Sequence, residues 1–279
     1  MTTLTTRSTL ATAAAALLGA LAGGCATTGE LKQDTFQARK HLASELIARG
    51  DLATAFSYAD SLHRERPRDA EVLVLRGVIY RDKRMSTEAE GDLREAIALD
   101  EELAEAHAAL GILYDLIHRS EAAQAEHERA VALAPGNARY LNNLGFSLFM
   151  RGRAQDAVTV FGRAARLDPT NRRLRTNLGF ALAATGDLRG AVREFEMGGS
   201  PAESKNNLGF AYERRGDLAR AFALYQEASS LDPASTRARA NLAFAAAALG
   251  RDLPADAMPS DTSSNHTAGA AHGVAAFSP

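Results

Sequence analysis

Histidine, cysteine and carboxylate side chains are the groups in this chain that could do chemistry. His107, His118 and His127 lie close together in the sequence, but their spacings of eleven and nine residues match no metal-ligand pattern. The chain also lacks a His-Glu-x-x-His zinc helix, a Gly-x-Ser-x-Gly elbow, a phosphate-binding glycine loop and paired cysteines. We therefore expect no catalytic residues, no metal and no cofactor, and we interpret His127 as a packing residue.

Charge and composition exclude further classes of function. Removal of a leader that contains Arg7 leaves 31 basic and 34 acidic residues, a formal charge of about −3, so no electrostatic case for nucleic-acid binding exists. Beyond the leader no apolar run is long enough to span a bilayer. A lone cysteine, Cys25, excludes an internal disulfide. No motif for a small-molecule substrate is present.

The elements that position these side chains follow a fixed period. Glycines recur every 34 residues, and alanines keep the same period twelve residues after the first three glycines. The series are Gly77, Gly111, Gly145 and Gly179, and Ala89, Ala123 and Ala157. A period of this length indicates one supersecondary unit copied along an axis, so that each copy contacts mainly its neighbours.

Each copy is predicted to be a pair of helices. In 138–171, Leu141, Leu144 and Leu148 form the apolar stripe of a first helix, and Phe161 lies on the stripe of a second. Asp168-Pro169 ends the second helix, because proline disfavours helical geometry in the residue before it. Gly145 and Ala157 are small, which lets the two helices approach closely where they cross.

These positions carry a resemblance to the tetratricopeptide repeat, or TPR. Residues 104–137 read Leu110, Gly111, Tyr114, Ala123, Ala130, Pro135, and residues 202–235 read Leu208, Gly209, Tyr212, Ala221, Tyr225, Ala228, Pro233. The resemblance implies an all-α, right-handed solenoid over residues 36–250. Its units are 36–69, 70–103, 104–137, 138–171, 172–201 and 202–235, followed by a capping helix at 236–250.

One unit departs from the period. Four residues are missing between Gly179 and Gly209, where the segment from Met197 to Pro201 shortens the second helix. Four residues are close to one helical turn, so the neighbouring faces stay nearly in phase. We expect a local change in superhelical curvature at 172–201 and no break between domains.

The N-terminal segment predicts export. Residues 1–24 contain one charge and an apolar run typical of a signal peptide, and they are followed by Cys25, in a context that resembles the lipobox of bacterial lipoproteins. The resemblance implies lipidation of Cys25, with residues 25–35 as lipidated end and tether. Ala26 resembles the second residue of lipoproteins sent to the outer membrane and facing the periplasm. Ordinary cleavage, or an unprocessed tail on a cytosolic protein, remain open alternatives. At the other end, residues 251–279 are predicted to be disordered.

The face of the first helices that points away from the second helices is the predicted binding surface. Four copies present Asn and Phe three residues apart, and by the resemblance this face lines a groove that holds an extended peptide. The predicted groove residues are Asn143, Phe146, Phe149, Met150, Asn177, Phe180, Asn207, Phe210, Asn241 and Phe244. We expect these rings to lie outside the core.

The predicted function is a non-enzymatic, outer-membrane-anchored adaptor that binds a protein partner, an extended or amphipathic segment, in this groove. In architecture the chain is similar to the tight-adherence (Flp) pilus assembly lipoproteins and to the pilotins of type IV pili. That similarity implies help in assembling a pilus or secretion machine, with a secretin or pilus component as partner. The alternative is a soluble periplasmic or cytosolic module that regulates an envelope enzyme such as a hydrolase or protease.

Overall fold

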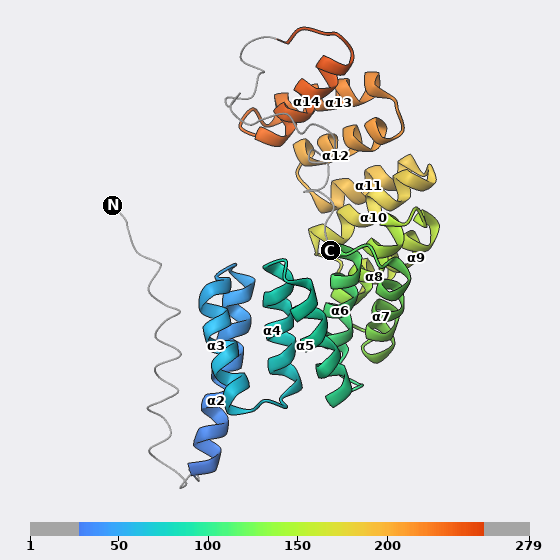
Figure 1. Cartoon of the computed structure of the whole chain (residues 1–279). Coiled ribbons are helices and arrows are strands. Elements are labelled where there is room, and N and C mark those ends of the chain that lie inside the picture. The colour runs from blue at the N-terminus through green and yellow to red at the C-terminus, as the bar shows by residue number, and fades with distance from the viewer. Residues whose placement is uncertain (1–27, 254–279) are drawn as a thin grey trace, which may run out of the picture. The chain divides into compact units, whose positions relative to one another are not determined.

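The computed structural model describes residues 28–253, with side chains from residue 33 onward. This part of the chain contains thirteen α-helices, labelled α2 to α14, and no strand (Figure 1). The predicted all-α class is confirmed. None of these helices combines the length and the apolar character that a bilayer crossing needs. The predicted leader, Cys25 and residues 254–279 of the predicted tail lie outside the described residues.

Contacts divide the chain into two units, residues 1–67 and 68–279. In the first unit α2 (Thr28–Ala48) packs on α3 (Leu52–Glu65), and Phe36, Ala43 and Ala55 are fully buried. The guanidinium of Arg66 lies 4.0 Å above the Phe36 ring. Because α2 begins at Thr28, helix extends over most of the segment that the sequence assigned to the tether.

The second unit is a row of helix pairs followed by one single helix (Figure 1). Each first helix packs on the second helix of its own pair and on neighbouring pairs, as in a helical-repeat solenoid. The pairs are α4 (Ala70–Asp82) with α5 (Ser86–Leu99), α6 (Ala104–Leu116) with α7 (Ser120–Leu133), α8 (Ala138–Met150) with α9 (Ala154–Leu167), α10 (Arg172–Thr185) with α11 (Leu188–Gly198), and α12 (Pro201–Arg214) with α13 (Leu218–Leu231). The single helix is α14 (Thr236–Ala248).

The periodic glycines of the first helices make room for a large side chain of the second helix. A Cβ atom added at Gly145 would lie 2.8 Å from the Phe161 ring, and one at Gly209 would lie 2.7 Å from the Tyr225 ring. At Gly209 the added atom would also lie 3.3 Å from the backbone oxygen of Ala221, so the two helices do approach closely. The glycine therefore fixes where the ring of the second helix enters the core.

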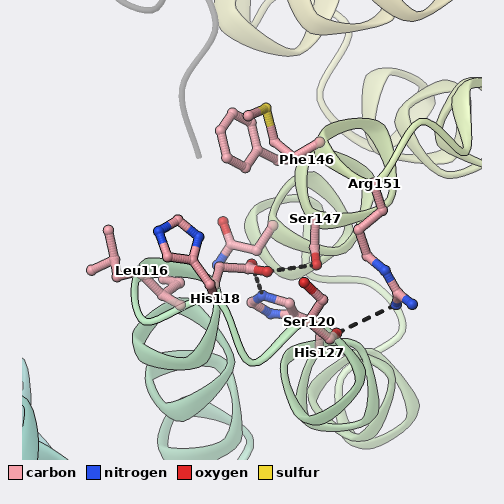
Figure 2. Close-up of a pocket in the computed structure, with 11 residues that line it drawn as sticks. Leu116, His118, Ser120, His127, Phe146, Ser147 and Arg151 are labelled. Carbon is pink, nitrogen blue, oxygen red and sulfur yellow. Dashed lines mark hydrogen bonds and ion pairs between the residues drawn. The ribbon is translucent and has the colours of Figure 1, made fainter.

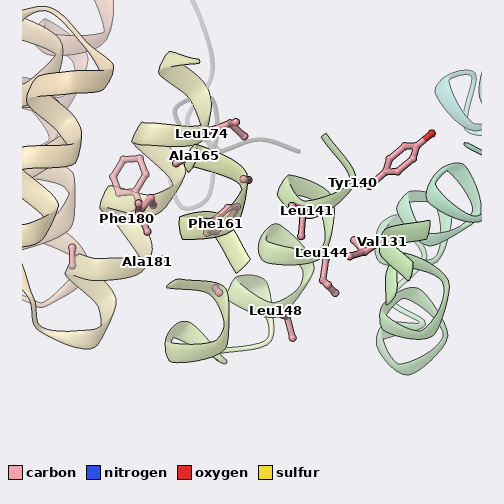
Figure 3. Close-up of a cluster of buried hydrophobic side chains, with 14 of the residues drawn as sticks. Val131, Tyr140, Leu141, Leu144, Leu148, Phe161, Ala165, Leu174, Phe180 and Ala181 are labelled. Carbon is pink, nitrogen blue, oxygen red and sulfur yellow. The ribbon is translucent and has the colours of Figure 1, made fainter. Parts of the chain in front are cut away.

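The shortened unit keeps its core in contact with the next unit. α11 has 11 residues where α9 has 14, as the sequence predicted. Ser200 caps α12 through a capping box with Glu203, and Pro201 occupies the first turn of that helix. The buried cluster that contains Phe161 and Phe180 (Figure 3) also includes Ala211 of α12. The absence of a domain break and the change in curvature at this unit both stay predictions.

α14 closes the last apolar face of the second unit. Its Leu242 and Ala245 pack in one cluster with Ala221 and Tyr225 of α13. No second helix follows α14 within the described residues, which end at Leu253. The predicted capping helix is confirmed.

Candidate functional site

The candidate site lies on one face of the first helices, which we call the first-helix face. It is defined by the residues at the same register of successive units, Ile112, Phe146, Phe180, Phe210 and Phe244. Ile112 and Phe146 line one pocket, and the rings of Phe180 and Phe210 meet edge to face with centroids 5.7 Å apart. Side chains one repeat apart in sequence therefore lie next to one another along this face.

The phenylalanines of this face are not equally exposed. Phe146, Phe149, Phe210 and Phe244 are half-buried, whereas Phe180 is only 5% exposed and belongs to the core. Phe195 of α11 covers the Phe180 ring with a centroid distance of 4.9 Å, and Phe210 covers it from α12. The expectation that all these rings lie outside the core is wrong for Phe180, because aromatic neighbours from two other helices enclose it.

Two of the four predicted groove asparagines bond to the preceding unit. The Asn177 amide donates to Asn142 Oδ1 at 2.7 Å, and the Asn241 amide donates to Asn206 Oδ1 at 2.9 Å. Asn177 is fully buried and Asn241 is 3% exposed. Each bond links two successive first helices, so these amides stabilise the stacking of units.

The other two asparagines have no such bond. Asn143 is 4% exposed and Asn207 is 6% exposed, and in the described part of the chain neither side-chain amide has a hydrogen-bond partner. The reason lies one unit earlier, where Ala108 stands at the register that Asn142 and Asn206 occupy, and so offers Asn143 no acceptor. Neither amide is among the fully buried polar groups that lack a partner, so water reaches both, and a ligand that bonds to them would replace that water.

Asn143 borders a pocket between α6 and α8, which we call the α6/α8 pocket (Figure 2). Its volume is about 240 Å³, enough for one side chain and too small for a drug-sized molecule. Its entrance is apolar: Leu116 is 44% exposed and Met150 is 64% exposed. The complete lining is Ile112, Asp115, Leu116, His118, Ser120, His127, Asn143, Phe146, Ser147, Met150 and Arg151.

Asp115 organises the polar side of the pocket. Its Oδ1 accepts from Ser147 Oγ at 2.8 Å and its Oδ2 lies 2.9 Å from His127 Nε2 (Figure 2). His127 is 1% exposed, and its ring fills the space at Gly111, which confirms its interpretation as a packing residue. The carboxylate stands between the hydroxyl and the imidazole, so Ser147 has no direct hydrogen bond to His127, the contact that activates a serine nucleophile.

A similar carboxylate contact occurs three units later. Tyr225 Oη donates to Glu213 Oε2 at 2.8 Å, with the same separation of twelve residues as in the pair of Asp115 and His127. Burial, together with the Glu213 charge and hydrogen bond, raises the pKa of Tyr225 above its usual range, so the phenol remains a donor. Glu213 does not line the α6/α8 pocket. A carboxylate contact at this register therefore serves packing, and Asp115 differs from Glu213 because it also lines the pocket.

The loop that follows α6 borders the pocket on another side. His118 adopts a left-handed backbone with φ of 60°, at the register where Gly152 has φ of 77°. Arg151 donates to the backbone oxygen of Ser120 at 3.3 Å (Figure 2), and it pairs with Glu121 at 3.2 Å. The guanidinium charge is thus partly balanced within the second unit.

The structure brings some of the predicted site residues together and adds others. Asn143, Phe146 and Met150 meet in the pocket, while Phe149 packs against the core. Asp115, Leu116 and Ser147 were missed, because they differ from unit to unit and repeat-by-repeat comparison favours what is shared. In the described residues, no group of three or more His, Cys, Asp or Glu side chains could hold a metal ion.

The sequence profile of the tetratricopeptide repeat matches residues 138–171 and 202–235. Those two segments are tetratricopeptide repeats. They carry the glycine and ring positions described above, at Gly145, Phe161, Gly209 and Tyr225. The resemblance inferred from the sequence is confirmed, and the structure places helix pairs of the same design between and before these two tetratricopeptide repeats.

Solved structures share this fold, whereas no curated protein matches the chain by sequence. PilF from Pseudomonas aeruginosa is 19% identical with a TM-score of 0.60, over 77% of this chain and 98% of PilF. PilW, described as a widely conserved type IV pilus biogenesis factor, is 17% identical with a TM-score of 0.63, over 75% and 97%. YrrB, described as a TPR protein with an unusual peptide-binding site, is 21% identical with a TM-score of 0.51, over 64% and 95%. At these identities the likeness shows the fold alone.

Proposed function

We propose that this protein is a non-enzymatic adaptor that binds an extended or amphipathic segment of a protein partner along its first-helix face. The observation that carries the proposal is the α6/α8 pocket, where an apolar entrance stands beside the unpartnered amide of Asn143. Exposed Leu116 and Met150 gain free energy when a partner covers them, and the amide can bond a peptide group. Half-buried Phe210 and Phe244 would extend the contact toward α14.

The cellular setting is proposed from the sequence. Lipidation of Cys25 would fix the protein on the outer membrane with its helical repeats in the periplasm, since two acyl chains give stable anchoring. One of the solved structures with this fold, PilW, is described as a type IV pilus biogenesis factor. We therefore propose that the partner belongs to a pilus or secretion machine, such as a secretin, and that the adaptor assists its assembly.

Capture of a partner from solubilised envelopes tests the binding surface. The double change Leu116→Glu with Met150→Glu puts two charges at the entrance and should abolish capture, because burying an unpaired carboxylate is costly. The matched control is Leu167→Glu with Leu231→Glu, two leucines that are 49% and 56% exposed at the ends of second helices. Capture that fails equally with both pairs, or survives the entrance pair, would contradict the proposal.

Mass spectrometry of the mature N-terminus tests the anchor separately. The expected species begins at Cys25 and carries acyl chains, so it should partition with membranes until Cys25→Ser releases it. Detection of an intact Met1, or of an unmodified Cys25 in soluble protein, would remove the anchored part of the proposal and leave the binding surface to be judged by capture.

A further inference from the structure

We infer that the α6/α8 pocket receives one cationic side chain, arginine or lysine, from the partner segment. The inference rests on the proposed function, because it assigns the chemistry of one position in the segment that the first-helix face would bind. It is argued from the charges, the unpartnered amide and the apolar walls of the pocket.

The carboxylate of Asp115 provides the negative charge. Each of its two oxygens already has one hydrogen-bond partner within the fold: Oδ1 contacts the Ser147 hydroxyl, and Oδ2 contacts His127 Nε2. A carboxylate offers about four acceptor sites, so two remain for a donor that enters the pocket. The Asp115 side chain is 24% exposed, which leaves it within reach from the pocket. Hydrogen bonds between a cation and a carboxylate are among the strongest in proteins.

The one arginine of the lining does not balance this charge. Arg151 is engaged by Gln124, by the Ser120 backbone oxygen and by Glu121, and no ion pair or hydrogen bond joins it to Asp115 within the described residues. Asp115 is the one carboxylate among the residues that line the pocket, and Arg151 makes its contacts with other groups. A cationic side chain that enters can pair with Asp115, whereas an aspartate or glutamate would be repelled by it.

Asn143 supplies a second acceptor. Its side chain is 4% exposed, borders the pocket and has no hydrogen-bond partner within the described residues. The amide oxygen of Asn143 can accept from an ammonium or a guanidinium, each of which carries several donors. A purely apolar occupant would instead seal this amide and Asp115 away from water without bonds, at a cost of free energy.

The walls suit the stem of a long basic residue. Leu116 and Met150 form the entrance, and Ile112 and Phe146 are half-buried beside it. Arginine and lysine pack their methylene stems on apolar surface while the charged tip reaches a polar group. The Phe146 ring adds a surface that attracts a cation. The pocket therefore offers apolar contacts to the methylene stem of such a side chain and hydrogen-bond acceptors to its charged tip.

Binding of defined peptides tests the inference directly. The probes are acetyl-Leu-Arg-Leu-amide and the same peptide with citrulline, a neutral analogue of arginine with nearly the same shape. The protein is the mature chain with Cys25→Ser, and binding is followed through the backbone amide resonances of Leu116, Phe146 and Met150. We expect saturable shifts with the arginine peptide and affinity about tenfold lower for citrulline, the ratio that corresponds to losing one charge-assisted bond.

Variants show which carboxylate is responsible. Asp115→Asn should remove the preference for arginine over citrulline, while Glu213→Gln, at the equivalent position of a later unit, should keep it. Melting curves confirm that both variants are folded, and the citrulline comparison on the unchanged chain needs no variant. Equal affinity for the two peptides, tighter binding of acetyl-Leu-Glu-Leu-amide, or no saturable shift would overturn the inference. Partner capture that still depends on Leu116 and Met150 would then leave the proposed function standing.

Discussion

Replacing Gly145 with alanine tests how the helix pairs are held together. An added Cβ atom would lie 2.8 Å from two atoms of the Phe161 ring, closer than real Cβ contacts allow, so the ring or the helix must shift. Overpacking of this kind costs about 1–3 kcal/mol. Alanine also gains up to about 1 kcal/mol of helix propensity over glycine, which offsets part of the cost.

Gly162 is the matched control, because it lies in the second helix of the same unit. A Cβ atom there would meet only the flexible tip of Arg166, at 3.7 Å. Both changes gain the same helix propensity, so the difference between Gly162→Ala and Gly145→Ala isolates the packing cost. We expect Gly162→Ala to stabilise the protein, and Gly145→Ala to lie about 1–3 kcal/mol below it in free energy of unfolding.

Urea unfolding followed by circular dichroism measures both variants. Adding Phe161→Ala to Gly145→Ala should cost less than the sum of the single changes, because the smaller side chain vacates the space that the new methyl group needs. If Gly145→Ala stabilised the protein as much as Gly162→Ala, the position of the Phe161 ring would not depend on Gly145. Our account of the packing would then be refuted.

Three further changes have defined outcomes. Asn177→Ala should lower the free energy of unfolding by about 1–3 kcal/mol, because it leaves the buried acceptor Asn142 Oδ1 without its donor. Asn143→Ala should be nearly neutral, and urea unfolding measures the difference between the two variants. Phe180→Ala should cost about 3–5 kcal/mol by opening a cavity in the core, which a loss of less than 1 kcal/mol would contradict. Burial alone would raise the pKa of Glu203, but the Ser200 backbone N–H and hydroxyl and the neighbouring guanidinium together hold it below its ordinary value of 4.5. The ionised Glu203 therefore stabilises the fold above that value, and this contribution is lost as pH falls through the lower, folded-state pKa. Glu203→Gln should reduce the fall of the melting temperature between pH 5 and pH 3, and an unchanged pH dependence would contradict this reading.

The sequence predicted the helix pairs because their signals are local and repeated. The apolar stripe around Leu144, the helix stop at Pro169 and the missing turn before Ser200 each act within a few residues, and the structure has all three. The burial of Phe180 was not predicted, because it depends on Phe210, which lies in another unit.

The candidate site was harder to predict because it depends on differences between units. Asn143 and Asn177 look equivalent in sequence, yet only Asn177 has an asparagine at the partnering register of the preceding unit. Likewise the α6/α8 pocket needs Asp115 from one unit and Ser147 from the next, 32 residues apart. Such pairs become visible only when the units are stacked, since no local pattern contains both members.

The most direct test of the central claim is photo-crosslinking in living cells. A photoreactive phenylalanine analogue at position 150 replaces an exposed methionine of the pocket entrance. The same analogue at position 231 replaces a leucine of similar exposure at the end of α13. We predict that light forms one defined protein adduct from position 150 and none from position 231. An adduct from position 231 alone would contradict the assignment of partner binding to the first-helix face.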